Sequence, residues 1–374
     1  MKKILSVFGT RPEAAKMVPL LLEMRKADVE SLVCVTAQHR ELLDDVLRPF
    51  DITPNFDLNI MTAGQTLTEI TARVLHGLAP VLRETRPDVL LVHGDTTTTF
   101  AASLAAFYAQ VDVGHVEAGL RSFDKYRPYP EEINRKLTTA VADFHFAPTE
   151  LARKNLLNEN VPAEKIFVTG NTAIDMIKHT VRADYAFMNP ALRGADFSKR
   201  IILMTAHRRE NWGEPMEKIC MAVKRVAETF DDVQVIWAVH PGKAAHDPPH
   251  KILADVPKIL LTEPLHIFDM HNLMSRAFLI LTDSGGLQEE APSFNLPVVV
   301  LREVTERPEG LAAGMLVLAG TDSIFDETAR LLTDDAAYKK MAAAENPFGD
   351  GKASERIVEV LQKSQASLHH PGTF

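Results

Sequence analysis

The sequence has few of the residues that build disulfide frameworks and metal centres. Its two cysteines, Cys34 and Cys220, both lie in apolar segments. We therefore expect two buried free thiols in a reducing compartment. No stretch of the sequence has the spacing of a metal cluster, so no metal ion is predicted.

Long apolar runs are also missing. No stretch approaches the length of a membrane span. The first apolar run ends at Phe8, is too short for a signal peptide and is soon followed by Arg11. We expect a cytoplasmic protein. The net charge of -9 and the pI of about 5.9 argue against nucleic acid or an anionic membrane as a partner.

The glycine pattern of dinucleotide-binding sites is absent too. The first predicted strand ends in Gly9-Thr-Arg-Pro12 instead of Gly-x-Gly-x-x-Gly, so a nicotinamide cofactor is not predicted. The sequence has no Gly-x-Ser-x-Gly elbow and no cysteine in the setting of a nucleophile. No cofactor of any kind is expected.

The chain does contain a repeated alternation of short apolar strands and helices. Its 374 residues are too many for one hydrophobic core. The alternation is lost over residues 180–198 and restarts at Ile201. We predict the α/β class, with two Rossmann-like, doubly wound parallel-sheet domains, 1–175 and 176–352, that face each other across a cleft. The last helix, within 353–374, is expected to cross back to the first domain.

Polar residues follow nearly every predicted strand. Ligands of doubly wound sheets lie beyond the carboxyl ends of the strands, so these residues form the candidate site. In the first domain they are Arg11, Lys16, Gln38, His39, Arg40, Asp95 and Glu117, with Glu131 and Arg135 in a following helix. In the second domain they are His207, His240, Leu265, Met270, Ser284, Gly285, Gly286, Glu290 and Arg307.

The stretch Leu281–Glu290 combines a strand end, a Ser284-Gly-Gly286 turn and a short helix, expected over Leu287–Phe294. Backbone N–H groups at the positive end of a helix bind anions, and glycine lets a ligand approach the backbone. A diphosphate suits this turn. An ordinary strand-to-helix turn would explain the same residues. These ten residues alone do not decide between a diphosphate site and such a turn.

The acidic residues also have two explanations. Asp95 precedes a run of threonines and could cap the helix expected over Phe100–Ala109, or it could act in acid–base chemistry. Glu131 and Glu132 open a helix, and the helix dipole explains one of them. It does not explain why Glu131 and Arg135 share one helix face.

The cationic residues favour an anionic ligand. Arg11 and Lys16 lie in the first turns of a helix, where they oppose the dipole and gain no stability from it. Together with the carboxylates and His207, they indicate acid–base chemistry on a nucleotide diphosphate. The residues alone do not choose between sugar transfer, hydrolysis and proton abstraction.

Eight ordered motifs carry a resemblance to a known family. They are Phe8-Gly-Thr-Arg-Pro-Glu13, Thr36-Ala-Gln-His-Arg40, Val92-His-Gly-Asp-Thr-Thr-Thr-Thr99, Gly114-His-Val-Glu-Ala-Gly-Leu-Arg121, Pro130-Glu-Glu-x-Asn-Arg135, His207-Arg-Arg-Glu210, Thr282-Asp-Ser-Gly-Gly-x-Gln-Glu-Glu-Ala-Pro292 and Thr305-Glu-Arg-Pro-Glu309. Over nearly its whole length the chain resembles the bacterial non-hydrolysing UDP-N-acetylglucosamine 2-epimerases. The resemblance implies the GT-B architecture and a homodimer.

The resemblance also implies a reaction. The family inverts C2 of UDP-N-acetylglucosamine to give UDP-N-acetylmannosamine, by eliminating UDP to a 2-acetamidoglucal and adding it back. The product supplies N-acetylmannosamine for the synthesis of bacterial surface polysaccharide. By motif match, Asp95, Glu117 and Glu131 are acid–base carboxylates, and His207 is a catalytic or phosphate-contacting group. Which carboxylate serves which ring face is left open.

The same match assigns the binding residues. The Ser284-Gly285-Gly286 turn would hold the diphosphate, Glu290 the ribose, and Arg11 and Arg307 negative charge. The family usually places an aromatic residue near the uracil, where this chain has Met270, which packs less specifically. Residues 38–40, Gln38, His39 and Arg40, match a stretch that in some family members binds a second UDP-N-acetylglucosamine as an activator.

Three other functions remain as alternatives at this stage. A GT-B glycosyltransferase would need an acceptor and would leave UDP free. A hydrolysing epimerase would release UDP and free N-acetylmannosamine. A non-catalytic regulator that binds sugar nucleotides would keep the phosphate and ribose sites but would not need several acid–base groups.

Overall fold

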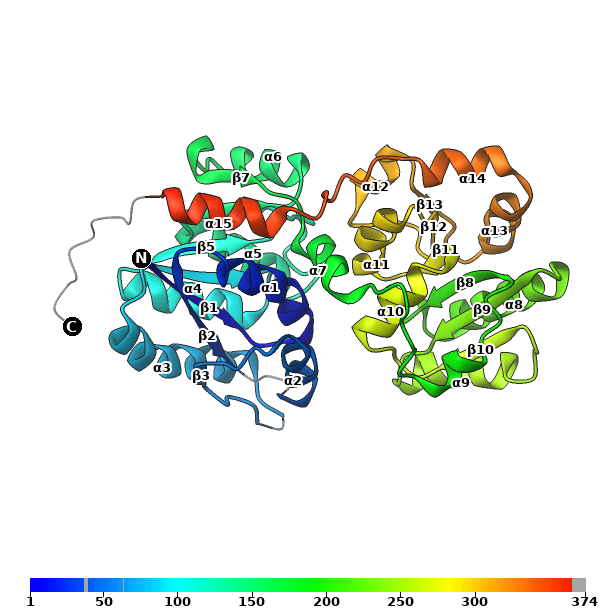
Figure 1. Ribbon diagram of the computed structural model, residues 1–374, viewed down its shortest axis with the longest axis horizontal. Coiled ribbons are helices and arrows are strands. Elements are labelled where there is room, and N and C mark those ends of the chain that lie inside the picture. The colour runs from blue at the N-terminus through cyan, green and yellow to red at the C-terminus, as the bar shows by residue number, and fades with distance from the viewer. Residues whose placement is uncertain (37–39, 63, 365–374) are drawn as a thin grey trace. The chain divides into compact units, whose positions relative to one another are not determined.

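The computed structural model describes residues 1–36, 40–62 and 64–364. The chain forms two compact units. Unit 1 contains Met1–Met176 and the segment from Gly349 onward, and unit 2 contains Ile177–Phe348 (Figure 1). Each unit is a parallel β-sheet with helices packed against it. The predicted fold class, two doubly wound parallel sheets, is confirmed.

The sheet of unit 1 has the strand order β3-β2-β1-β4-β5-β6-β7, with all neighbours parallel. The order reverses between β1 and β4, and such a switch point is where ligands bind in doubly wound sheets. The strands are β1 (Lys2–Phe8), β2 (Val29–Val35), β3 (Phe56–Asp57), β4 (Val89–His93), β5 (Asp112–Val116), β6 (Phe144–Ala147) and β7 (Ile166–Val168).

Two helices of unit 1 begin at capping boxes. Thr10 and Glu13 form a reciprocal capping box at the start of the first helix, and Thr66 and Glu69 form another. Such a cap is worth about 1 kcal/mol. The helices are α1 (Arg11–Met24), α2 (Arg40–Leu47), α3 (Leu67–Thr85), α4 (Thr97–Tyr108), α5 (Glu131–Val141), α6 (Glu150–Asn158), α7 (Thr172–Thr180), which continues into unit 2, and α15 (Ala353–Lys363).

Unit 2 repeats the same topology with one strand fewer. Its strand order is β10-β9-β8-β11-β12-β13, so its switch point lies between β8 and β11. The strands are β8 (Arg200–Thr205), β9 (Val233–Ala238), β10 (Ile259–Thr262), β11 (Ala277–Thr282), β12 (Val298–Val300) and β13 (Leu316–Leu318). The helices are α8 (Glu214–Thr229), α9 (Lys243–Leu253), α10 (Ile267–Met274), α11 (Gly285–Glu290), α12 (Pro308–Ala313), α13 (Ile324–Thr333) and α14 (Asp335–Ala342).

Two predicted element boundaries were wrong. The helix expected from Phe100 begins at Thr97, because Thr96 is its cap and the other threonines continue the helix. The helix expected over Leu287–Phe294 is instead α11, which begins at Gly285, followed by a short 3-10 helix over Ala291–Phe294. In both cases the helix starts directly at the strand-end turn, which brings its first N–H groups closer to the candidate site.

Helix α15 follows unit 2 in the sequence but belongs to unit 1, where it packs on α1 (Figure 1). Its start is fixed by the buried carboxylate of Asp175, which accepts from the backbone N–H groups of Ala353 at 3.1 Å and Ser354 at 2.8 Å. Arg356 donates to the carbonyl of Thr169 at 3.0 Å. Residues far apart in sequence therefore complete one unit.

Within the described ranges, no helix is both long and apolar enough to cross a membrane. In the same part of the chain, no group of three or more His, Cys, Asp and Glu side chains could hold a metal ion. Cys34 and Cys220 are buried free thiols, as expected.

Three histidines are buried in the sheet of unit 1, and we expect them to make stability fall in mild acid. Burial lowers the pKa of His93 to about 4, of His115 to about 3 and of His145 to about 4. An unfolded histidine has a pKa of about 6.5, so in acid only the unfolded chain binds these protons. The free energy of unfolding should then fall by up to about 4 kcal/mol per pH unit as the pH drops from roughly 6 to 4.

Urea unfolding at stepped pH values measures this slope. His145→Gln removes one of the three rings and should reduce the slope by about a third. His76→Asn, which removes an exposed ring, is the matched control. An unchanged slope in His145→Gln would contradict the assignment to buried neutral histidines.

Candidate functional site

Three predicted residues of unit 1, Arg11, Asp95 and Glu117, lie beyond the carboxyl ends of β1, β4 and β5, around the switch point of that sheet. Arg11 opens α1 directly after β1. Asp95 follows β4, and Glu117 follows β5. Because β4 and β5 are neighbours paired in register, with His93 opposite Val116, the two carboxylates stand at adjacent strand ends.

Asp95 is not the cap of α4. Thr96 takes that role by accepting from the Thr99 N–H at 3.1 Å. The Asp95 carboxylate instead accepts from Arg135 Nη2 at 2.7 Å and from Arg135 Nε at 3.0 Å. Asn134 Nδ2 donates to the Asp95 backbone carbonyl at 2.9 Å. Helix α5 therefore orients the carboxylate at the end of β4.

Arg135 is shared between two carboxylates. Burial by itself opposes its charge, but Asp95 and Glu132 raise the pKa of Arg135 above its usual value. Glu132 is fully buried and also accepts from the N–H groups of Ser122 at 3.0 Å and Phe123 at 3.1 Å. Of the two acids that open α5, Glu132 is thus the structural one. Glu131 is the first residue of α5 and is half-buried.

Glu117 has an unusual backbone conformation. Its φ of 67° is left-handed, which costs a non-glycine residue about 1–2 kcal/mol. Lys16 of α1 forms an ion pair with Glu117 Oε1, and Asn171 Nδ2 donates to the same oxygen at 3.2 Å. Such strain persists where the surroundings fix a residue tightly, and it is commonest at functional sites.

His93 is a neighbour of Glu117 that sequence reasoning did not assign to the site. It ends β4, and its Nε2 lies 3.8 Å from Glu117 Oε2. Burial lowers its pKa to about 4, against the opposing effect of Glu117, so the ring is neutral near neutral pH. The signal in the sequence was a polar residue closing an otherwise apolar strand.

Glu13 is a second buried group that was missed. Its Oε1 accepts from the hydroxyls of Thr96 at 2.8 Å and Thr99 at 3.2 Å. Its Oε2 accepts from the N–H groups of Thr10 at 2.7 Å and Gly9 at 3.1 Å. Burial raises the pKa of Glu13 above its usual value. The carboxyl group ties the start of α1 to the start of α4.

In unit 2 the switch point brings together His207, after β8, and Asp283, after β11. Asp283 is fully buried. Its Oδ2 accepts at 2.8 Å from three donors, the N–H groups of His207 and Arg208 and the Nδ2 of Asn211. Its Oδ1 lies 3.2 Å from His207 Nδ1. Burial lowers the pKa of His207, and the Asp283 carboxylate works in the opposite direction.

The Ser284-Gly-Gly286 turn lies directly beside this pair. Ser284 is the extended residue before α11, which begins at Gly285. A Cβ on Gly285 would lie 3.3 Å from Arg307 Nη2, so glycine leaves room for the guanidinium next to the turn. Arg307 Nε is held 2.5 Å from the buried Oε1 of Glu289. The turn thus combines the first N–H groups of a helix with an oriented cation.

The other predicted residues of unit 2 have varied surroundings. Glu290 Oε2 lies 3.3 Å from Nε2 of the buried His271. Leu265 is buried in an apolar cluster, and Met270 of α10 packs against the same cluster. His240 is exposed, and its ring stacks on that of His207 with centroids 5.8 Å apart.

The predicted activator stretch lies largely outside the described residues. Gln38 and His39 lie outside the described residues. Arg40 opens α2, but its side chain also lies outside them.

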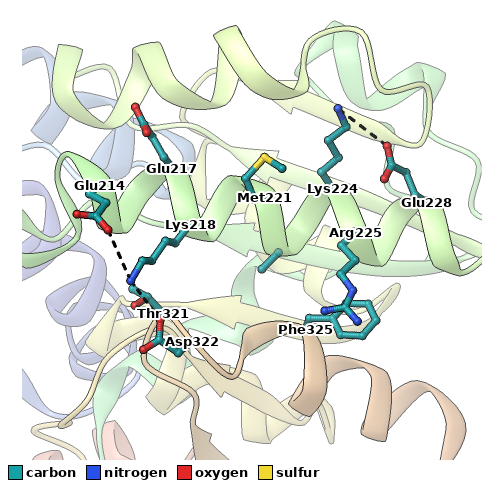
Figure 2. A pocket seen from close by; sticks show the side chains of 11 residues that line it. Glu214, Glu217, Lys218, Met221, Lys224, Arg225, Glu228, Thr321, Asp322 and Phe325 are labelled. Carbon is teal, nitrogen blue, oxygen red and sulfur yellow. Dashed lines mark hydrogen bonds and ion pairs between the residues drawn. The ribbon is translucent and has the colours of Figure 1, made fainter.

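A hollow of about 790 Å³ lies elsewhere on unit 2, between α8 and α13 (Figure 2). None of the predicted site residues lines it. Several of its charges pair with each other, such as Lys218 with Glu214 at 3.8 Å and Lys224 with Glu228 at 4.0 Å. The volume of this hollow is therefore not a reason to prefer it as the functional site over the strand ends, where the oriented carboxylates and cations lie.

Comparison with known proteins adds a family. Residues 22–362 match the family model described as UDP-N-acetylglucosamine 2-epimerase. The UDP-N-acetylglucosamine 2-epimerase of Bacillus subtilis is 56% identical over 362 residues, covering 96% of this chain and 94% of that protein.

Solved structures agree with this match. The S. aureus MnaA–UDP co-structure has a TM-score of 0.87 and 51% sequence identity, covering 97% of this chain and 96% of that one. The UDP-GlcNAc 2-epimerase of Neisseria meningitidis, bound to UDP-GlcNAc, has a TM-score of 0.89 and 46% identity, covering 97% of this chain and all of that one.

Proposed function

The chain belongs to the UDP-N-acetylglucosamine 2-epimerase family, a family of isomerases, and we propose that it interconverts UDP-N-acetylglucosamine and UDP-N-acetylmannosamine. The observation that carries this proposal is the pair of oriented carboxylates at the ends of the neighbouring strands β4 and β5. Arg135 orients Asp95, and Lys16 orients Glu117. Two fixed carboxylates suit a reaction that removes a proton from one face of a carbon and returns it to the other.

The proposed chemistry is elimination and re-addition. No carbonyl lies next to C2 in the ring, so the C2 proton is not acidic enough for simple abstraction. One carboxylate takes the proton, the C2–H electron pair forms the C1=C2 bond, and the C1–O bond breaks to release UDP. In the return step a UDP oxygen adds to C1 and a protonated group delivers the proton to the opposite face. Asp95, Glu117 and Glu131 are the candidates for these proton transfers.

The departing UDP needs compensation for its negative charge. We assign the diphosphate to the N–H groups of the Ser284-Gly-Gly286 turn and to Arg307, because donors already in place stabilise charge as it develops. His207 lies beside the same turn, where it can contact phosphate or move a proton. Glu290 would accept from the ribose hydroxyls, and Arg11 would add positive charge.

Further parts of the proposal extend beyond the reaction. We propose that the protein works as a homodimer without a cofactor, that residues 38–40 bind a second UDP-N-acetylglucosamine as activator, and that the product feeds surface polysaccharide synthesis. We also propose a cytoplasmic location, in keeping with two buried free thiols.

Incubation with UDP-N-acetylglucosamine in D₂O, followed by proton NMR, tests the proposed reaction. We expect UDP-N-acetylmannosamine to appear, with deuterium at C2 of both sugars. UDP together with free N-acetylmannosamine would point to hydrolysis instead. No turnover together with tight UDP binding would favour a transferase or a binding protein and would overturn the proposal.

A further inference from the structure

Asp283, at the switch point of unit 2, has no role in the reaction proposed above. Asp283 follows β11 and meets His207 after the adjacent strand β8, with Thr282 and Thr205 joined by a hydroxyl contact of 2.7 Å just before them. The carboxylate of Asp283 is fully buried. A buried carboxylate is costly unless it is paired and hydrogen-bonded, so its partners define its role.

The two carboxylate oxygens have different partners. Three donors occupy Oδ2, from His207, Arg208 and Asn211, each at 2.8 Å. These contacts fix the orientation of the carboxylate and leave Oδ1 facing the His207 ring, 3.2 Å from Nδ1. Among the described residues Oδ1 has no hydrogen-bond partner, so the ring is the group near enough to compensate its charge. A carboxylate can only accept a hydrogen bond, so a proton on the ring nitrogen that faces it is the favoured arrangement.

We propose that Asp283 is a positioning residue for His207, which holds the ring in the Nδ1–H tautomer and presents Nε2 as the nitrogen available to the substrate. The role of His207 in turnover rests on the proposed function. The tautomer itself does not, since it is argued from the 3.2 Å approach of the carboxylate to the imidazole.

The loop after β8 also has anchors that do not involve Asp283. Trp212 Nε1 donates to the His207 carbonyl at 3.3 Å, Asn211 Nδ2 donates to the Leu301 carbonyl at 3.2 Å, and Arg302 pairs with Glu210 at 2.5 Å. None of these three contacts involves the His207 ring, which Asp283 does contact.

Three charged or titratable groups influence the His207 ring. The Asp283 carboxylate favours its protonated form, whereas Arg208 and the stacked ring of His240 oppose it. Removing the Asp283 charge therefore lowers the pKa of His207. Any limb of the pH profile that follows His207 must then move to lower pH.

The test is Asp283→Asn in the full chain labelled with ¹⁵N-histidine, with the His207 signals identified by their loss in His207→Gln. We expect the Nδ1–H tautomer in the wild type, and in Asp283→Asn a shift toward the Nε2–H tautomer and a lower His207 pKa. In the same variant kcat should fall by about 100-fold with the His207 limb of the pH profile displaced downward. Unchanged tautomer and pKa would overturn the proposal.

Two further variants separate positioning from loop structure. Asn211→Ala removes a donor from the loop but keeps the carboxylate beside the ring, so it should retain the Nδ1–H tautomer. Asp283→Glu keeps the charge and should restore part of the pH profile. If Asn211→Ala changed the tautomer as much as Asp283→Asn, the role of Asp283 would be structural and the proposal wrong. If the tautomer shifts as expected in Asp283→Asn but the wild-type protein has no epimerase activity, the result would instead count against the proposed function.

Discussion

Asparagine in place of Asp95 is expected to lower the epimerisation rate by about 10²–10⁴-fold, the usual contribution of a general acid or base, and to leave UDP affinity unchanged. Asparagine has the shape of aspartate but can neither take nor give a proton at neutral pH. The Asn134 contact is made to the backbone carbonyl of residue 95 and survives the change. Arg135 keeps its contact with Glu132 at 3.2 Å, so the local structure should persist.

The rate is measured by NMR of the sugar protons, and UDP affinity by calorimetry. Asp88→Asn is the matched control, because Asp88 precedes the same strand, β4, and accepts from the Lys3 N–H at 2.7 Å at the opposite end of the sheet. A loss of UDP binding as large as the loss of rate in Asp95→Asn would assign Asp95 to ligand binding. Full activity would remove it from the mechanism.

Methionine in place of Arg307 is expected to weaken UDP binding by about 10–150-fold, since hydrogen bonds to a charged group contribute about 1.5–3 kcal/mol. It should also lower the free energy of unfolding, because the buried carboxylate of Glu289 loses the cation 2.5 Å away. Removing one member of a buried ion pair costs about 3–5 kcal/mol. One substitution thus affects both stability and binding.

The double variant Arg307→Met with Glu289→Gln distinguishes the two effects. Glutamine removes the buried charge, so much of the stability should return in urea unfolding while UDP binding stays weak. Arg307→Lys keeps the charge without the guanidinium fork and should fall between the wild type and Arg307→Met in affinity. Recovery of UDP binding in the double variant would show that Arg307 acts only by holding Glu289.

The sequence predicted the fold well because its signals were strong and local. Apolar strands that end in glycine and polar residues, with helices between them, specify a doubly wound parallel sheet, and the carboxyl ends of its strands indicate where a site lies. The short strand β3, Phe56–Asp57, was missed. Two residues are too few to carry a periodicity, and their pairing with β2 is set by the tertiary structure.

The site was harder to predict in its details. Whether Asp95 caps α4 depends on which of two adjacent polar residues reaches the helix, and Thr96 reaches it. Glu131 and Glu132 look alike in sequence, yet only the folded loop of Ser122 and Phe123 shows that Glu132 is structural. The partners of Asp283 come from another strand end, so no local pattern could identify them.

The order of the segments along the chain has a consequence for biosynthesis. Unit 1 needs α15, with Ile357 and Leu361 fully buried, yet α15 is translated after the whole of unit 2. The ribosome adds about 5–20 residues per second. The apolar surface that α15 covers therefore stays exposed for roughly 10–30 seconds before α15 is synthesised. Unit 2, continuous in sequence, can fold during that interval. The unit whose synthesis begins first is therefore completed last, and it must remain partly unfinished while unit 2 is made.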